Sequence, residues 1–302
     1  MRLLGWFRHR DEGNTEEAQP RRWTWLAGHR VLTNTPYIMP KDKAEGDRLN
    51  IQHHLVKVAT GSNYHAPLRQ PRSILDVACG TGVWAREMAQ QFPRARVIGF
   101  DIDRTPLERS MEVLGPGGQF PLNFRFQQAD ALKPFPFEDE EFDFVHARFI
   151  VGFVPVTAWP GVISEIMRVT RRGGYVEMTE MAEMTSSPSQ AYATLRQHII
   201  RFMESRGLYA GIGDHLRPYL VHAGLRDAQE QRFVLGFGKD AKRQQRLLSA
   251  DVLAGVDIIK PVLVKLGFMS EAECEAAAAR AKMEIPQMGI KMPIVCVYGQ
   301  KP

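Results

Sequence analysis

Cysteine is scarce in this chain: 302 residues contain only Cys79, Cys274 and Cys296, and no C-x-x-C motif. This excludes a disulfide framework and a zinc site built from cysteines. A reducing, intracellular setting is the simplest interpretation, so we expect a cytoplasmic protein. Long uncharged apolar runs are also missing, and we therefore expect no membrane-spanning helix.

Charge of one sign does not dominate either. The formal net charge is +5, from 39 basic and 34 acidic residues, and the basic residues form no long run. Because an aromatic-rich RNA-binding motif is absent as well, we expect no nucleic-acid partner. With 44% hydrophobic and 24% charged residues, the composition is that of a globular protein, although it leaves the oligomeric state open.

Short apolar runs alternate with helical stretches from residue 73 onward. The pattern predicts strands at 73–78, 95–100, 123–128, 142–147 and 175–179. Helices are expected between them at 83–92, 106–114 and 158–170. This alternation predicts an α/β fold in which helices cover both faces of a parallel sheet.

The rhythm changes after residue 185. A long amphipathic helix is expected at 190–205, and two strands at 229–237 and 293–298 are separated by mostly helical residues. Upstream, residues 42–59 read as a helix. Residues 1–30 read as a flexible tail, with a surface-binding arm as the alternative.

The most informative motif is the turn Asp76-Val77-Ala78-Cys79-Gly80-Thr81-Gly82, between the first strand and the first helix. Its glycines allow a tight turn and leave room for a ligand against the main chain. Acidic residues also stand at the ends of the first three strands, namely Asp76, Asp101 and Asp130. Since a crevice forms outside the carboxyl ends of such strands, we expect these acids around one ligand.

The three acids favour an adenosine ligand that carries positive charge. A carboxylate at Asp101 can accept hydrogen bonds from both hydroxyls of a ribose, and Asp130 can accept one from an adenine amino group. Asp76 can face a cationic amino group. A dinucleotide site is the alternative, but no glycine follows at 85–86 to complete G-x-G-x-x-G.

Five segments in order resemble the class I S-adenosylmethionine-dependent methyltransferases: D-V-A-C-G-T-G, G-F-D-I-D, Q-A-D-A, P-F-P-F-E-D-E-E-F-D-F-V and R-R-G-G-Y-V-E. They cover roughly residues 72–180. The resemblance implies a Rossmann-like, doubly wound, seven-stranded sheet whose last strand, at 293–298, is antiparallel. It also implies S-adenosyl-L-methionine as cofactor and a small-molecule acceptor for the methyl group.

The resemblance assigns roles to the motif residues. The glycine loop would hold the methionine end of the cofactor through Asp76, Ala78, Gly80, Thr81 and Gly82. Asp101 would bind the ribose, and Ile102, Asp130 and Ala131 would lie by the adenine. Arg148 follows the fourth strand, at the family's active-site mouth, and is counted with the cofactor-binding residues. Residues 71–302 would form this domain, with a helical insertion at about 238–291.

A second resemblance lies upstream and at the end of the chain. Y-I-M-P-K-D at 37–42, the residues that follow to His54, and V-C-V-Y-G-Q-K-P at 295–302 are similar to methyltransferases related to fungal secondary-metabolism enzymes and regulators. It implies that 31–70 is a helical lid segment over the cofactor. Tyr37, Arg48 and Gln52 would face the methionine end, with Arg48 on its carboxylate; plain helix surface or packing is the alternative.

Several residues near the mouth have two interpretations. His146 is the candidate general base, or a packed histidine. The candidate substrate contacts are Tyr64, Phe149, Phe153 and Glu180, with core packing as the alternative for the aromatic residues. Asp143 is expected to be a structural cap and Cys79 a packing residue. No metal is expected, because His53 and His54 are adjacent on a helix and point apart.

A methyltransferase is the function that these observations favour. A regulator or scaffold that keeps the fold and acts through protein partners is the alternative, because the upstream resemblance includes regulators. A cofactor-binding enzyme that transfers no methyl group, such as a cyclase, is a third. The sequence names neither the acceptor nor the atom that is methylated.

Overall fold

The structure is a computed structural model that describes residues 23–26, 29–32, 39, 42–108, 120–184, 187–238 and 240–302, with the backbone alone for 23–32. Three expectations lie outside the described residues in whole or in part. They are the first part of the tail, the end of the helix at 106–114, and the position of Tyr37.

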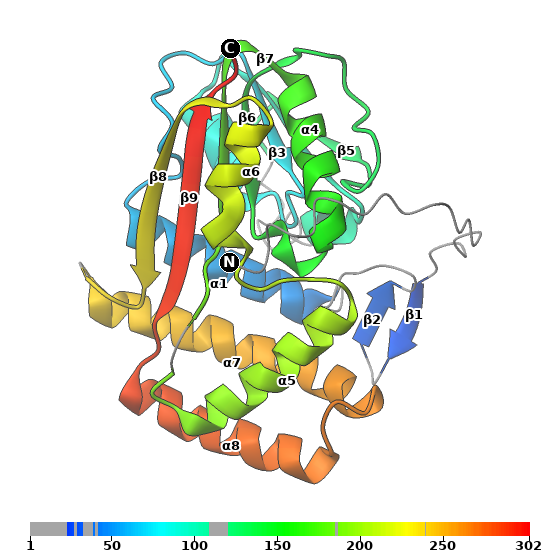
Figure 1. Cartoon of the computed structure of the whole chain (residues 1–302), viewed down its shortest axis with the longest axis vertical. Helices are drawn as coiled ribbons and strands as arrows, with labels where there is room; N and C mark the ends of the chain where they lie inside the picture. The colour runs from blue at the N-terminus through cyan, green and yellow to red at the C-terminus, as the bar shows by residue number, and fades with distance from the viewer. Residues whose placement is uncertain are drawn as a thin grey trace.

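Seven strands form one mixed sheet in the order β5-β4-β3-β6-β7-β9-β8 (Figure 1). Their bounds are β3 (Ser73–Val77), β4 (Arg96–Asp101), β5 (Phe124–Gln128), β6 (Phe142–Arg148), β7 (Thr170–Met181), β8 (Arg226–Leu235) and β9 (Met292–Gln300). Strands β3 to β7 are parallel, and β9 is antiparallel to both β7 and β8. The doubly wound sheet with an antiparallel last strand is confirmed.

Helices cover both faces of the sheet because side chains alternate along each strand. Ile74 and Phe144 pack with α2 (Val83–Gln91) on one face, and Leu75 and Val145 pack with α4 (Trp159–Val169) on the other. The short helix α6 (Leu216–His222) lies near α4 (Figure 1). Each strand tip is thereby fixed by a packed core.

Four further helices form a layer at the carboxyl ends of the parallel strands (Figure 1). They are α1 (Lys43–Thr60), α5 (Gln190–Ser205), α7 (Ala241–Lys265) and α8 (Glu271–Met288). Helices α7 and α8 form the expected insertion between β8 and β9, and α7 packs against α1. No helix of the described residues is long and apolar enough to cross a bilayer.

Strand β7 begins earlier than the sequence pattern predicts. Gly173 and Gly174 predict a turn before a strand at 175, but β7 already pairs with β6 at Thr170. The register shifts between Phe142 and Phe144, so the two glycines lie in a bulge. A Cβ at Gly174 would come within 3.0 Å of the Asp143 carbonyl oxygen, which explains the glycine there.

Two antiparallel strands precede helix α1 along the chain. Strands β1 (Trp23–Leu26) and β2 (His29–Leu32) pair with Trp23 opposite Leu32. Residues 23–26 and 29–30, which were expected to belong to a flexible tail, therefore lie in strands, and the boundary placed at residue 30 falls inside β2. The missed signal is the set of β-prone residues on both sides of Gly28.

Candidate functional site

A cavity of about 310 Å³ lies where the strand tips meet helices α1 and α7. Of the predicted cofactor residues that the structure describes, all but Gly82 line it: Arg48, Gln52, Asp76, Ala78, Gly80, Thr81, Asp101, Ile102, Asp130, Ala131 and Arg148. Further lining residues come from α5 and α7, in which the sequence pattern did not mark any site residue. The cavity thus joins residues from both halves of the chain.

The glycine loop has an unusual backbone. Ala78, Gly80 and Gly82 all adopt positive φ angles, of 55°, 55° and 71°. At Gly82 a Cβ would lie 2.6 Å from Leu107, so only glycine fits this position. Gly82 caps α2 and does not itself line the cavity, which corrects its expected ligand contact. Its role is to turn the chain so that the preceding residues face the cavity.

Asp101 connects the loop to the second strand. Its carboxylate accepts hydrogen bonds from the backbone N–H groups of Gly80 and Asp103, both at 3.1 Å. The residue is 6% exposed and lines the cavity at the tip of β4. At the next tip, Asp130 accepts a hydrogen bond from the Leu132 N–H at 3.0 Å. Both carboxylates are therefore held in fixed orientations beside the cavity.

Asp76 and His146 form a buried pair that the sequence did not predict. They face each other on the parallel strands β3 and β6, with Nδ1 of His146 2.9 Å from Asp76 Oδ1. The imidazole stacks on Trp84 with ring centroids 3.8 Å apart. Burial lowers the pKa of His146, so we expect a neutral ring at pH 7 that donates from Nδ1. Its Nε2 atom makes no hydrogen bond within the described residues.

Arg48 forms ion pairs with two protein carboxylates. Its guanidinium donates to both oxygens of Glu45 at 2.7 and 2.8 Å, and to Asp251 of α7 at 2.7 Å. All three side chains are largely buried. Arg48 therefore joins helix α1 to helix α7, in line with the packing alternative. The positive charge of its guanidinium is already balanced by these two carboxylates.

Arg148 has a different environment at the end of β6. It lines the cavity and forms no ion pair with any carboxylate of the described residues. Its Nη2 lies 3.1 Å from Nδ1 of His53 on helix α1. Burial lowers the pKa of Arg148, although the charges of Asp76, Glu87 and Glu177 oppose this. The guanidinium faces the cavity and, within the described residues, forms no direct ion pair with these carboxylates.

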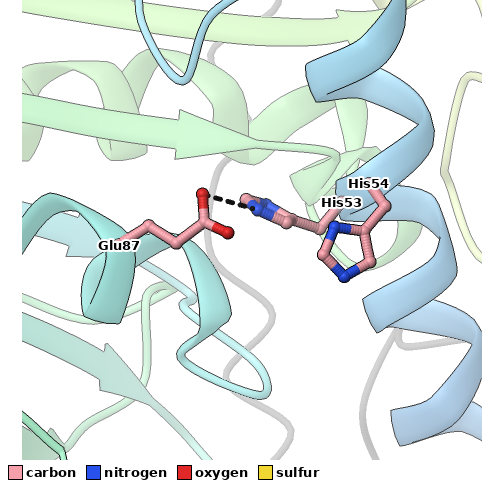
Figure 2. Close-up of side chains that lie close together, drawn as sticks. All are labelled: His53, His54 and Glu87. Atoms are coloured by element: carbon pink, nitrogen blue, oxygen red, sulfur yellow. Dashed lines mark ion pairs between the residues drawn. The ribbon is translucent and has the colours of Figure 1, made fainter.

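The imidazole of His53 forms a hydrogen bond with the Arg148 guanidinium. Burial lowers the pKa of His53 to about 4, so the ring is neutral at pH 7. Since Arg148 can only donate, His53 accepts at Nδ1 and carries its proton on Nε2, which lies 3.3 Å from Glu87 (Figure 2). Burial alone would raise the pKa of Glu87, but hydrogen bonds from His53, Lys57 and Asn63 hold it below its usual range.

The same residues form the histidine and carboxylate cluster of Figure 2. Ligand atoms of His53, His54 and Glu87 lie within 4.8 Å of one another. The carboxylate oxygen that faces His53 already receives Lys57 Nζ at 2.5 Å and Asn63 Nδ2 at 2.9 Å. A metal ion here would have to displace an ammonium group, so the cluster is better described as a hydrogen-bond network.

The expected substrate contacts divide into two groups. Phe149 and Phe153 line the cavity, whereas Tyr64 and Glu180 are not among its lining residues. Tyr64 packs against Phe92 and Phe144 on the α2 side, because the chain after α1 folds over that helix. Glu180 is fully buried and accepts from the Ile150 N–H at 2.6 Å. It holds the 3₁₀ turn η2 (Ile150–Gly152) instead of a ligand.

Two structural expectations are met. Asp143 accepts hydrogen bonds from the backbone N–H groups of Arg72 and Ser73, so it caps the start of β3. Cys79 packs against the backbone of β4, where a Cβ at Gly99 would lie 2.8 Å from its Sγ. Cys79 also lines the cavity, whereas Asp143 lies at the opposite end of β3.

We expect stability to fall as pH rises, because burial raises the pKa of Glu177 to about 7 and of Glu180 to about 8. Both are protonated in folded and unfolded chains at low pH. The stabilising contribution is lost as pH rises through the folded values, by at most about 1.4 kcal/mol per pH unit and group. In urea unfolding between pH 5 and 8, the free energy of unfolding should therefore depend less steeply on pH for Glu180→Gln than for the wild type. Exposed Glu183→Gln is the control; equal slopes for all three proteins would contradict this origin.

Three comparisons with known proteins agree with this geometry. Residues 74–174 match the model of the methyltransferase domain family. The chain is 38% identical over 132 residues to methyltransferase str3 of Strobilurus tenacellus. This alignment covers 43% of this chain and 44% of that protein. It is 33% identical over 153 residues to the secondary metabolism regulator LAE1 of Cochliobolus heterostrophus, with 48% and 46% covered. The matches thus span less than half of these two relatives.

A solved structure gives the fold comparison. Phosphoethanolamine N-methyltransferase 2 of Haemonchus contortus, in complex with S-adenosyl-L-methionine, superposes with a TM-score of 0.50 and 18% identity. The match covers 85% of this chain and 52% of that one. Together with the sequence match, the common fold confirms the resemblance that the motifs indicated. Residues 74–174 therefore match a methyltransferase domain in sequence, and the described chain shares its fold with a methyltransferase.

Proposed function

We propose that this chain binds S-adenosyl-L-methionine in the cavity and transfers its methyl group to a small-molecule acceptor, of the kind found in secondary metabolism. The observation that carries the proposal is the convergence of the glycine loop, Asp101 and Asp130 on one cavity. Relatives named as methyltransferases support the reaction type.

The residues fit the chemistry of this cofactor. Asp101 lies at the second strand tip, where a carboxylate accepts from both ribose hydroxyls. Ile102 and Ala131 offer apolar contact to an adenine beside Asp130. At the other end of the cofactor, Arg148 forms no ion pair with a carboxylate of the described residues, and it therefore replaces Arg48 as our candidate for the carboxylate of the methionine moiety.

When bound, the cofactor supplies a sulfonium methyl group, to which an acceptor lone pair forms a bond while the C–S electron pair stays on sulfur. The chain aligns the two molecules and excludes water from between them. An acidic acceptor proton would pass to a base. His146 fits that role, since the Asp76 carboxylate fixes the tautomer that leaves Nε2 able to accept a proton.

Thermal unfolding with cofactor tests the proposal. At a hundred times its dissociation constant, S-adenosylmethionine or its demethylated product adds about 2.7 kcal/mol of stability, a shift of about 5–10 °C. Absence of a shift with either ligand would contradict the proposal. Methyl transfer is then measured with a radiolabelled cofactor and a panel of small acceptors.

Replacing Arg148 by methionine tests its assigned role. Loss of a charge-assisted contact to a carboxylate should weaken binding of the demethylated cofactor by about 2–3 kcal/mol, which is about 30–150-fold. Titration calorimetry at 20 °C measures this apart from any loss of stability. Exposed Arg201→Met on α5 is the matched control. Equal affinities for the two variants would remove Arg148 from the cofactor site.

A regulator that acts through protein partners is the second candidate, favoured by the similarity to LAE1. A regulator that has lost catalysis has no need to keep every cofactor-contacting residue at one cavity, so the geometry favours the enzyme. Stable protein partners, combined with no turnover across a broad acceptor panel, would favour the regulator.

A further inference from the structure

One region of the cavity lining is apolar and begins directly after the tip of β6. Its walls come from the turn after β6 and from helices α5 and α7, through Phe149, Phe153, Ile199, Met203, Val256 and Ile259. No charged residue of α5 or of the turn η2 lines the cavity in the described ranges. The charged lining residue of α7 is Asp251, which is paired with Arg48.

This lining disfavours a charged acceptor. An ammonium group there would lose its water among apolar side chains, which costs several kcal/mol. A phosphate would have to compete for Arg148, whose guanidinium lies 5.9 Å from the centre of the Phe149 ring and is assigned to the cofactor carboxylate in our proposal. Phe149 instead offers an aromatic surface, and its backbone is held at φ 55°, a strained conformation for a bulky residue. Its N–H donates to the Thr179 carbonyl at 3.0 Å, which keeps the residue in that conformation.

Tyr192 adds a polar group to this apolar part. It lies in the first turn of α5, is 7% exposed and lines the cavity. Its hydroxyl makes no hydrogen bond to the described part of the chain. Burial raises the pKa of Tyr192 to about 12, so the phenol stays neutral and can either donate or accept. A hydroxyl that lines the cavity and has no partner among the described residues can pair with a polar group of a ligand.

We propose that the acceptor is an uncharged, largely aromatic molecule with a hydroxyl-type group that the Tyr192 hydroxyl binds. The inference rests on the proposed function, because it names the acceptor class for the same cavity. Tyr192 would then orient the acceptor and determine specificity, while Phe149 and the aliphatic side chains of α5 and α7 contact its ring.

Two probes of nearly equal shape test the proposal: 2-naphthol, which carries a hydroxyl, and 2-methylnaphthalene, which does not. Each is titrated into the full chain saturated with S-adenosylhomocysteine. Tyr192→Phe should weaken 2-naphthol by about fivefold, the effect of one neutral hydrogen bond, and change 2-methylnaphthalene by less than about twofold. Tyr219→Phe on α6, which does not line the cavity, is the control.

Charged probes complete the experiment. Phosphoethanolamine and sarcosine should bind at least about tenfold more weakly than 2-naphthol. Equal or tighter binding of either one would overturn the proposal, as would a Tyr192→Phe effect that is the same for both naphthalenes. If S-adenosylhomocysteine does not bind, the proposed function fails. The naphthalene pair is then titrated into the ligand-free chain, where the same two criteria decide on the apolar site alone.

Discussion

Asp101→Asn should greatly weaken cofactor binding while the chain stays folded. In our proposal the carboxylate accepts two ribose hydroxyls, and each charge-assisted hydrogen bond is worth about 1.5–3 kcal/mol. An asparagine amide keeps the size but turns one oxygen into a donor. We therefore expect the affinity for S-adenosylhomocysteine to fall by at least about 100-fold in titration calorimetry.

The matched control lies two residues further along the chain. Asp103 is also buried and accepts from the Thr105 N–H at 3.1 Å, but it does not line the cavity. Asp103→Asn should keep the affinity within about threefold. Circular dichroism checks that both variants fold. If Asp101→Asn binds as tightly as Asp103→Asn, the ribose does not lie at the tip of β4.

Arg48→Met should destabilise the chain by about 3–5 kcal/mol, since it leaves two buried carboxylates without a counter-charge. Glu45 and Asp251 have side chains that are 3% and 5% exposed, and Arg48 is the cation between them. Burial already raises the pKa of Asp251, which shows how little solvent reaches this carboxylate. Urea unfolding at pH 7 measures the change.

A triple variant that removes all three charges distinguishes the loss of the ion pairs from the cost of leaving buried carboxylates unpaired. Glu45→Gln, Arg48→Met and Asp251→Asn together should recover most of the loss, because no uncompensated buried charge remains. Arg201→Met, at an exposed position of α5, should change stability by less than about 0.5 kcal/mol. A loss below about 1 kcal/mol for Arg48→Met would show that the ion pairs do not join the lid to the insertion.

Much of the site was predictable because it depends on local patterns. Buried strand runs ending in an acid fix where Asp76, Asp101 and Asp130 stand, and parallel strands bring their carboxyl ends to one edge. The glycine turn is equally local, since positive φ angles at Gly80 and Gly82 require small residues. The contacts of a single side chain are harder to predict: Glu180 accepts a hydrogen bond from the Ile150 N–H in the turn after β6, which the sequence pattern did not indicate.

The sequence by itself determined the order of strands and helices, the glycine turn and the acids at the strand tips. Tertiary structure decided which charges meet. Arg48 pairs with Asp251, which lies 203 residues away, and Arg148 meets His53, 95 residues earlier. Tyr192 lines the cavity because it belongs to α5, which lies in the helical layer at the strand tips (Figure 1). The physical reason is that periodicity records which face of an element is buried, whereas partners across a cavity depend on how whole elements pack.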